Sequence, residues 1–351
     1  MKGKLALYTV LISAFIFSNQ PSLKAQTYTN AVDYMTAISD QFSKIMSETW
    51  DYTSAVAHGK SAKKVEANRK ELIKAIADAK KKISAMPGYD DDTAYRDSVV
   101  AFLAMDYNIM NNDYAKIVDM EEIAEQSYDQ METYLKAQEL ANAKLDRAND
   151  NLSVQQKLFA TENNINITEN KDKIAKKLES SDKVIKYYNI TYLIFFKSYK
   201  QEAYLLDAII KNDLTSIEQN KNTLLAYTTS GLAVLDTLKS FNGDANLKIA
   251  CKVALTFYKN EADTKILQDV LDYYSAKSKF EKIKTAFDAK AASSRTKTDV
   301  DEYNAAVTEY NKAGIKYNTT NTELNTKRTA AIEGWNKAGE AFLDKHVPKY
   351  K

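Results

Sequence analysis

The sequence predicts an all-α protein built as an elongated bundle of about seven long helices. Helix breakers are rare, because the 351 residues include only 8 glycines and 3 prolines, whereas β folds need frequent turns. Apolar residues recur at steps of three and four over long stretches, which is the spacing of one helix face. One stretch also occurs twice, which predicts two similar three-helix units in tandem.

The repeated stretch covers residues 52–72 and, with a shift of 152 positions, residues 204–224. Both copies place a helix-capping residue, Ser61 or Asp213, between two apolar-periodic segments. Four identities and two conservative pairs support an internal repeat. The aligned pairs are Tyr52 with Tyr204, Val65 with Ile217, Glu66 with Glu218, Asn68 with Asn220, Arg69 with Lys221 and Leu72 with Leu224.

Both copies then continue to a stop marked by a glycine, Gly88 in the first and Gly243 in the second. We therefore expect a first helical unit over residues 26–167 and a second over residues 168–351. The second is longer, which predicts an insertion near residues 289–320.

The first 25 residues have the pattern of a secretory signal peptide. Lys2 and Lys4 precede an uncharged, mostly apolar run over residues 5–17, and cleavage is expected after Ala25, so that the mature protein begins at Gln26. A membrane anchor is the alternative, but 13 residues cannot span roughly 30 Å of hydrocarbon at 1.5 Å per residue. No cysteine lies near the cleavage site, so a lipid-anchored lipoprotein is not expected.

Export leaves a nearly neutral chain. Removing Lys2, Lys4 and Lys24 lowers the number of Lys and Arg residues from 49 to 46, against 47 Asp and Glu, so the formal charge changes from +2 to about −1. Such a chain is a poor nucleic-acid binder.

The helices are expected to follow one another with short connections. In the third, Asn111, Asn112 and Asp113 mark a kink or break, because Asn and Asp favour caps over helix interiors. In the seventh, Tyr303, Tyr310 and Tyr317 follow a near-heptad pattern, which is typical of a coiled coil. The expected helices span residues 31–58, 61 to before Pro87, 94–160, 171–211, 213–241, 245–291 and, with Thr298 as its cap, 298 to before Pro348.

An acidic loop over residues 89–93 carries Asp90, Asp91 and Asp92. Three adjacent carboxylates are calcium-ligand types, but the EF-hand spacing is absent and no distant acid completes a shell. The simpler interpretation makes Asp92 or Thr93 the cap of the next helix, with the carboxylates at its positive end.

Residues for catalysis or metal binding are scarce. The chain holds two histidines, His58 and His346, and lacks paired Glu-x-x-His segments, zinc motifs and phosphate-binding glycine loops. The single cysteine, Cys251, is expected to be a core thiol beside Ile249 and Val253. We therefore expect a protein that is not an enzyme, with no catalytic, cofactor-binding or metal-binding residues.

Two side-chain groups leave an alternative open. Glu121, Glu122 and Glu125 lie on the third expected helix, where two of them would form a carboxylate pair if they faced inward. Solvated charges that pair with helix lysines are the simpler interpretation. The 23 tyrosines suggest stacking on sugars, but their core-facing spacing favours packing, and a protein interface is the expected use of exposed ones.

Two segments, residues 50–58 and 113–122, resemble a family of uncharacterised bacterial secreted or surface proteins. The resemblance covers mainly the first half of the chain. It implies an all-helical protein with an envelope or surface address and no assigned activity.

The expected function is therefore that of an exported, non-catalytic protein of the bacterial periplasm or cell surface. It binds a partner, expected to be another envelope or surface protein, or acts as a structural spacer; its oligomeric state is open. The alternative is a membrane-active bundle that resembles helical pore-forming toxins. The candidate insertion segment, residues 184–210, is interrupted by charges that oppose stable insertion. These charges are Lys186, Lys197, Lys200, Glu202 and Asp207.

Overall fold

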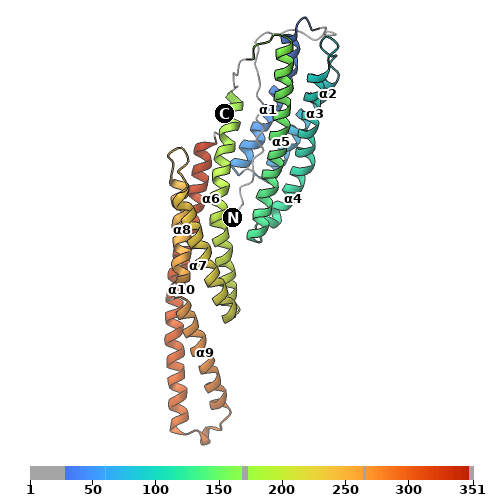
Figure 1. Cartoon of the computed structure of the whole chain (residues 1–351). Helices are drawn as coiled ribbons and strands as arrows, with labels where there is room; N and C mark the ends of the chain where they lie inside the picture. Colours follow the sequence, from blue (N-terminus) through green and yellow to red (C-terminus); the bar gives the residue numbers. More distant parts are fainter. Residues whose placement is uncertain (1–27, 60, 168–172, 264–265, 348–351) are drawn as a thin grey trace. The chain divides into compact units, whose positions relative to one another are not determined.

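The computed structural model describes residues 28–59, 61–167, 173–263 and 266–347, and these form an all-helical protein without a β-strand (Figure 1). The expected signal peptide, residues 1–25, and the mature end at Gln26 lie outside the described residues. The α-helices are α1 (Ala31–Ala57), α2 (Ala62–Ser84), α3 (Ala94–Asn108), α4 (Tyr114–Ala124), α5 (Tyr128–Glu162), α6 (Lys173–Ile210), α7 (Leu214–Thr237), α8 (Asn246–Asp263), α9 (Ile266–Asp288) and α10 (Lys297–His346).

The chain divides into two compact units, one formed by Met1–Asn189 with Glu340–Lys351 and the other by Ile190–Gly339. The long helices α6 and α10 each contribute to both units. The all-α fold class is confirmed, and the described helices outnumber the seven expected ones.

In the first unit, α1 packs on α2, α2 on α3, and α5 on both α3 and α4. Short connections force consecutive helices to run antiparallel, so that each buries an apolar stripe against its neighbour. Phe159 of α5 joins the stripes by stacking on Tyr95 of α3, with 5.1 Å between the ring centroids, and contacting Tyr34 of α1 at 5.7 Å. All three rings are buried.

The expected helix over residues 94–160 is wrong as one element. At Asn111, Asn112 and Asp113 the chain does not break; it widens into a single π-helical turn, Ile109–Asp113, and continues as α4. Arg69 of α2 donates a hydrogen bond of 2.6 Å to the Met110 carbonyl within this turn.

The actual break follows α4. Ser127 caps α5 by accepting a hydrogen bond from the Gln130 amide, and its hydroxyl donates to the Gln130 side chain. This Ser-x-x-Gln arrangement resembles a capping box, a sequence signal for a helix start that the predicted helix boundaries do not include.

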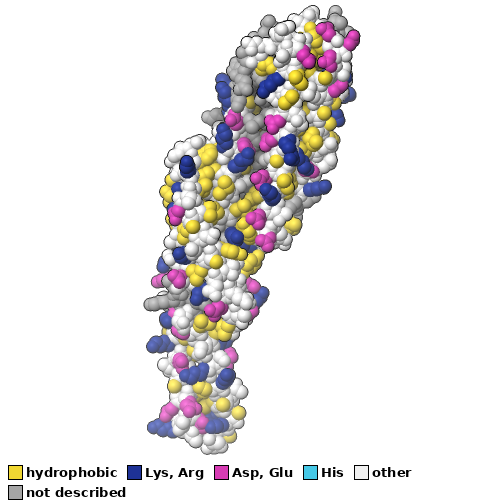
Figure 2. Space-filling model, in the orientation of Figure 1, with side chains coloured by type: hydrophobic (Ala, Val, Ile, Leu, Met, Phe, Trp, Pro, Cys, Tyr) yellow, Lys and Arg dark blue, Asp and Glu magenta, His cyan; other side chains and the backbone are white. Residues whose placement is uncertain are grey.

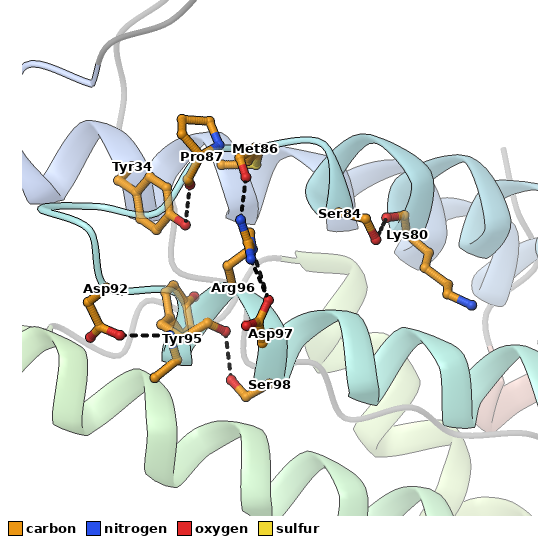
Figure 3. Close-up of polar contacts among 11 residues, drawn as sticks. Tyr34, Lys80, Ser84, Met86, Pro87, Asp92, Tyr95, Arg96, Asp97 and Ser98 are labelled. Carbon is orange, nitrogen blue, oxygen red and sulfur yellow. Dashed lines mark hydrogen bonds and ion pairs between the residues drawn. The ribbon is translucent and has the colours of Figure 1, made fainter.

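The turn between α2 and α3 ends one helix and caps the next within a few residues (Figure 3). Tyr89 and Asp92 exchange two backbone hydrogen bonds of 2.9 Å, and the two residues between them have positive φ. Asp92, rather than Thr93, supplies the side-chain cap, because its Oδ1 accepts from the Ala94 amide at 2.8 Å. Gly88 is required here, since a Cβ would lie 2.7 Å from the Asp92 carbonyl oxygen.

The second unit contains most of α6 with α7, α8, α9 and most of α10. Phe195 of α6 stacks on Trp335 of α10, with 4.6 Å between centroids, and both rings are buried. The expected helix over residues 245–291 is described as α8 and α9; residues 264–265 lie outside the described part. The expected cap Thr298 is wrong: Thr296 and Asp299 exchange hydrogen bonds as a capping pair at the start of α10.

We predict that Leu72→Ala and Leu224→Ala each lower the free energy of unfolding by about 2–5 kcal/mol. Both side chains are fully buried, in α2 and α7 respectively, so each truncation leaves a cavity. Chemical denaturation measures the loss, with Leu140→Ala as the control because Leu140 on α5 is exposed. A loss at either buried site as small as that of the control would contradict the packing described here.

Candidate functional site

The residues that the sequence analysis considered for chemistry are dispersed. The Cys251 thiol is buried and donates to the Thr191 carbonyl at 3.6 Å, and burial raises its pKa, so the core-thiol prediction is confirmed. The prediction that Ile249 and Val253 lie beside it in the core is wrong, because these side chains are 52% and 58% exposed and lie on the opposite face of α8.

The first histidine, His58, caps the end of α1, and its Nδ1 pairs with the Asp344 carboxylate of α10 at 2.7 Å. His346 packs on the ring of Phe342, one turn earlier on the same helix. Within the described parts of the chain, no group of three or more His, Cys, Asp or Glu side chains is placed to hold a metal ion.

The acidic candidates on the third expected helix do not form a described pair. The side chains of Glu121 and Glu122 lie outside the described part of the structure, and Glu125 is the half-buried C-cap of α4. In the acidic loop, Asp90 and Asp91 occupy exposed turn positions with positive φ.

Two features of the second unit stand out in their place. The first is the arm, formed by α9 and the part of α10 over residues 297–319, which run side by side in Figure 1. Aromatic rings recur every seventh residue on both helices and interlock across the arm. We call these six residues the aromatic ladder: Tyr273, Phe280, Phe287, Tyr303, Tyr310 and Tyr317.

The rings of the ladder meet face to face. Centroid distances are 4.6 Å for Phe287 and Tyr303, 5.2 Å for Phe280 and Tyr310, and 5.0 Å for Tyr273 and Tyr317. All six remain half-buried, and apart from Tyr317, which also lies beside α6, they pack where α9 and α10 meet. The arm therefore keeps aromatic surface in contact with solvent.

The second feature is a buried ionic cluster formed by Glu202 of α6, Glu261 of α8 and Arg328 of α10. The Arg328 guanidinium donates through Nε to Glu202, through Nη2 to Glu261 and through Nη1 to Asn325. The Glu202 and Glu261 side chains are each 3% exposed. Two carboxylates thus face one guanidinium away from water.

This excess of acid over base sets the protonation of the cluster. Burial, the neighbouring charge of Glu261 and a hydrogen bond to that carboxyl raise the pKa of Glu202 to about 9, against a partial opposing effect of Arg328. At neutral pH, Glu202 therefore keeps its proton, and the cluster approaches electrical neutrality.

A cavity of about 230 Å³ adjoins the cluster, and Glu261 and Arg328 form part of its wall. The lining residues from α6 and α9 are apolar, while α10 contributes hydroxyl and amide groups. The other lining residues are Leu205, Leu206, Ile209, Ile210, Val270, Tyr317, Thr320, Asn321, Leu324 and Asn325.

This site was not predicted from the sequence. There Glu202 reads as one of the charges that interrupt the apolar stretch over residues 184–210, whereas in the structure Glu202 is buried within α6. A carboxylate on the apolar stripe of a helix, where only a buried partner can balance it, was the available signal.

The apolar stretch itself is largely internal. Tyr192, Phe195 and Phe196 are buried in the second unit. Among the described residues, every helix is too short or too polar to cross a lipid bilayer.

Comparison with protein-family models, curated proteins and solved structures yields no match to this chain. The resemblance of residues 50–58 and 113–122 to bacterial surface proteins stays a prediction. In the structure, the first segment forms the end of α1, and the second begins at the π-helical turn and continues into α4.

We predict that the wild-type protein loses stability relative to Glu202→Gln as the pH rises from about 4.5 to about 9. In this window the folded protein holds a proton on Glu202 that the unfolded chain releases, so the unfolded state gains with rising pH. Denaturation of both proteins across this range measures the difference. Glu281→Gln, at an exposed site on α9, is the control, and a constant difference between wild type and Glu202→Gln would refute the prediction.

Proposed function

We propose that the protein is an exported, non-catalytic binding protein of the bacterial envelope or cell surface, built from two similar three-helix units, and that the arm holds its partner. The observation that carries the proposal is the half-exposed aromatic ladder. The partner is another envelope or surface protein.

The tandem organisation is supported by matching helix starts. Helices α2 and α3 begin at residues 62 and 94, and α7 and α8 begin at residues 214 and 246, which is the same shift of 152 that relates the repeated stretches. Ser61 and Asp213 are the N-caps of α2 and α7, and their side chains accept from the amides three residues later.

A matching turn adds further support. Phe241 and Asp244 exchange two backbone hydrogen bonds, as Tyr89 and Asp92 do 152 residues earlier. The two central residues of both turns have positive φ, and Asp244 caps the next helix through the Asn246 amide at 3.0 Å. The same turn chemistry therefore recurs at the same register.

Between α1 and α6, which begin the two proposed repeats, the shift is 153. The reason is that the connection from α6 to α7 is one residue shorter than the connection from α1 to α2. Asn68 donates to the Asp51 carbonyl, and its counterpart Asn220 donates to that of Tyr204. Tyr52 is fully buried whereas Tyr204 is 42% exposed, so pairing these two tyrosines is wrong. The corrected register pairs Tyr52 with Leu205, which is buried.

The arm is suited to binding because its own core is minimal. Between residues 277 and 319, Ala306 is the one buried side chain in the described structure. On the face of the arm shown in Figure 2, hydrophobic side chains lie among charged ones, and Ile315 of α10 is 69% exposed. Aromatic side chains within a polar rim are the usual composition of protein interfaces.

We predict that Ile315→Asp in the arm reduces capture of the native partner by tagged mature protein by roughly tenfold or more, as loss of an interface hot spot does. Quantitative pull-down from the native envelope, followed by mass spectrometry, measures the capture. Val253→Asp is the matched control, because Val253 is also apolar and exposed but lies on α8. Equal loss in both variants would argue against the arm as the binding surface.

We also predict that the exported protein begins at Gln26 and leaves the membrane fraction on washing with salt and carbonate. N-terminal sequencing and fractionation of the producing bacterium measure both properties. An uncleaved Met1 end would refute export through a signal peptide. Retention of the processed chain in washed membranes would favour the alternative, a membrane-active bundle.

A further inference from the structure

We propose that the cavity beside Glu202, Glu261 and Arg328 is a binding site for a small organic cation, an amine with a compact apolar body. The cavity lies among α6, α8, α9 and α10 of the second unit and is distinct from the exposed face of the arm. The apolar body packs against the aliphatic wall, and the ammonium group binds at the Glu261 carboxylate.

The size of the cavity fits such a ligand. An apolar cavity of about 150 Å³ in another protein holds benzene. The volume of about 230 Å³ here therefore accommodates a phenyl ring with a short side arm. Leu205, Ile209, Val270 and Leu324 provide the apolar surface.

The polar end of the cavity selects the head group. Glu261 Oε1 accepts from Arg328, whereas Oε2 is buried and accepts no hydrogen bond from an N–H or O–H of the described residues when Glu202 is ionised. Protonated Glu202 donates a hydrogen bond to the Glu261 carboxylate in addition to the one from Arg328. An ammonium group satisfies the same oxygen and balances the second carboxylate.

An anionic head group is disfavoured at this end. Three of the five N–H groups of Arg328 already donate to protein oxygens, which leaves only two for an anion. Two carboxylates against one guanidinium leave an excess of negative charge once Glu202 ionises. The cluster thus complements a cation and opposes a carboxylate or phosphate.

Comparison with the first unit indicates that packing alone does not require the cluster. By the register proposed above, on which this step rests, Glu202 corresponds to Thr49 and Glu261 to Ile109. Both counterparts are buried and uncharged. A three-helix unit can therefore fill these positions without ions, whereas burying charges is costly. A ligand that binds to these charges explains why the second unit accepts the free-energy cost of burying them.

Other charges near the cavity are already engaged. Helix α9 contributes Asp269, which accepts from Thr320 of α10 at 2.7 Å and pairs with Lys316. Lys316 also pairs with Asp272, at 3.5 Å.

The ammonium group and the proton of Glu202 compete for the same Glu261 oxygen. Ammonium binding is therefore coupled to proton release from Glu202, so affinity rises with pH until Glu202 is ionised.

The test is isothermal titration calorimetry of the full mature chain with 2-phenylethylamine, its neutral analogue 2-phenylethanol and the anion 3-phenylpropionate. The amine is expected to bind roughly tenfold or more tightly than the alcohol, since a hydrogen bond to a charged group contributes at least that factor. The anion is expected not to bind, and repeating the titration in buffers of different ionisation enthalpy is expected to show proton release.

Two variants and one control locate the site. Glu261→Gln is expected to remove the preference for amine over alcohol, and Leu324→Trp to remove binding by filling the cavity. Glu281→Gln on the exposed face of α9 leaves affinity unchanged. No saturable amine binding, equal affinity for amine and alcohol, or unchanged binding in Leu324→Trp overturns the proposal. Should Glu261→Gln fail to fold, the ligand series and Leu324→Trp decide the result.

Discussion

Capped turns of a few residues control how the helices pack. Asp92 and Asp244 each close a turn in which two residues with positive φ reverse the chain, and each caps the following helix. Because such a connection is short, the next helix runs antiparallel to the previous one, and the apolar stripes of the two helices face each other. The burial of Leu72 and Leu224 is a consequence of these turns as much as of apolar periodicity.

Within this packing, the second unit buries two carboxyls and a guanidinium in one cluster. Glu202, Glu261 and Arg328 are removed from water, and such a group is less favourable than well-packed apolar side chains of similar volume. Removing one member is worse still, since it leaves the others buried without balance. The shared proton between the carboxyls relieves part of the cost at neutral pH, and in doing so links the cluster to solution conditions.

Sequence reasoning succeeded where local chemistry dominates. The all-α class, the starts of α2 and α7 and the buried thiol of Cys251 follow from breakers, caps and periodicity. It failed where a choice depends on tertiary contacts. Asn111, Asn112 and Asp113 predict a kink or break, and the structure has a π-helical turn over Ile109–Asp113, whereas the helix ends before Ser127, where none was predicted to end. The cavity depends on residues from four helices, and no local pattern announces that combination.

The two candidate sites place opposite demands on the second unit. The aromatic ladder keeps rings half-exposed at the edge of a two-helix arm, where a partner can gain apolar contact without unfolding anything. The cavity places the buried charges of the cluster beside a pocket among four helices, where water screens electrostatic interactions less than at the open surface. Because α10 carries both Tyr317 and Arg328, and Tyr317 also lines the cavity, the last rung of the ladder is part of the cavity wall. A ligand in the cavity and a partner on the arm would therefore both contact α10, which provides a physical connection through which one could influence the other.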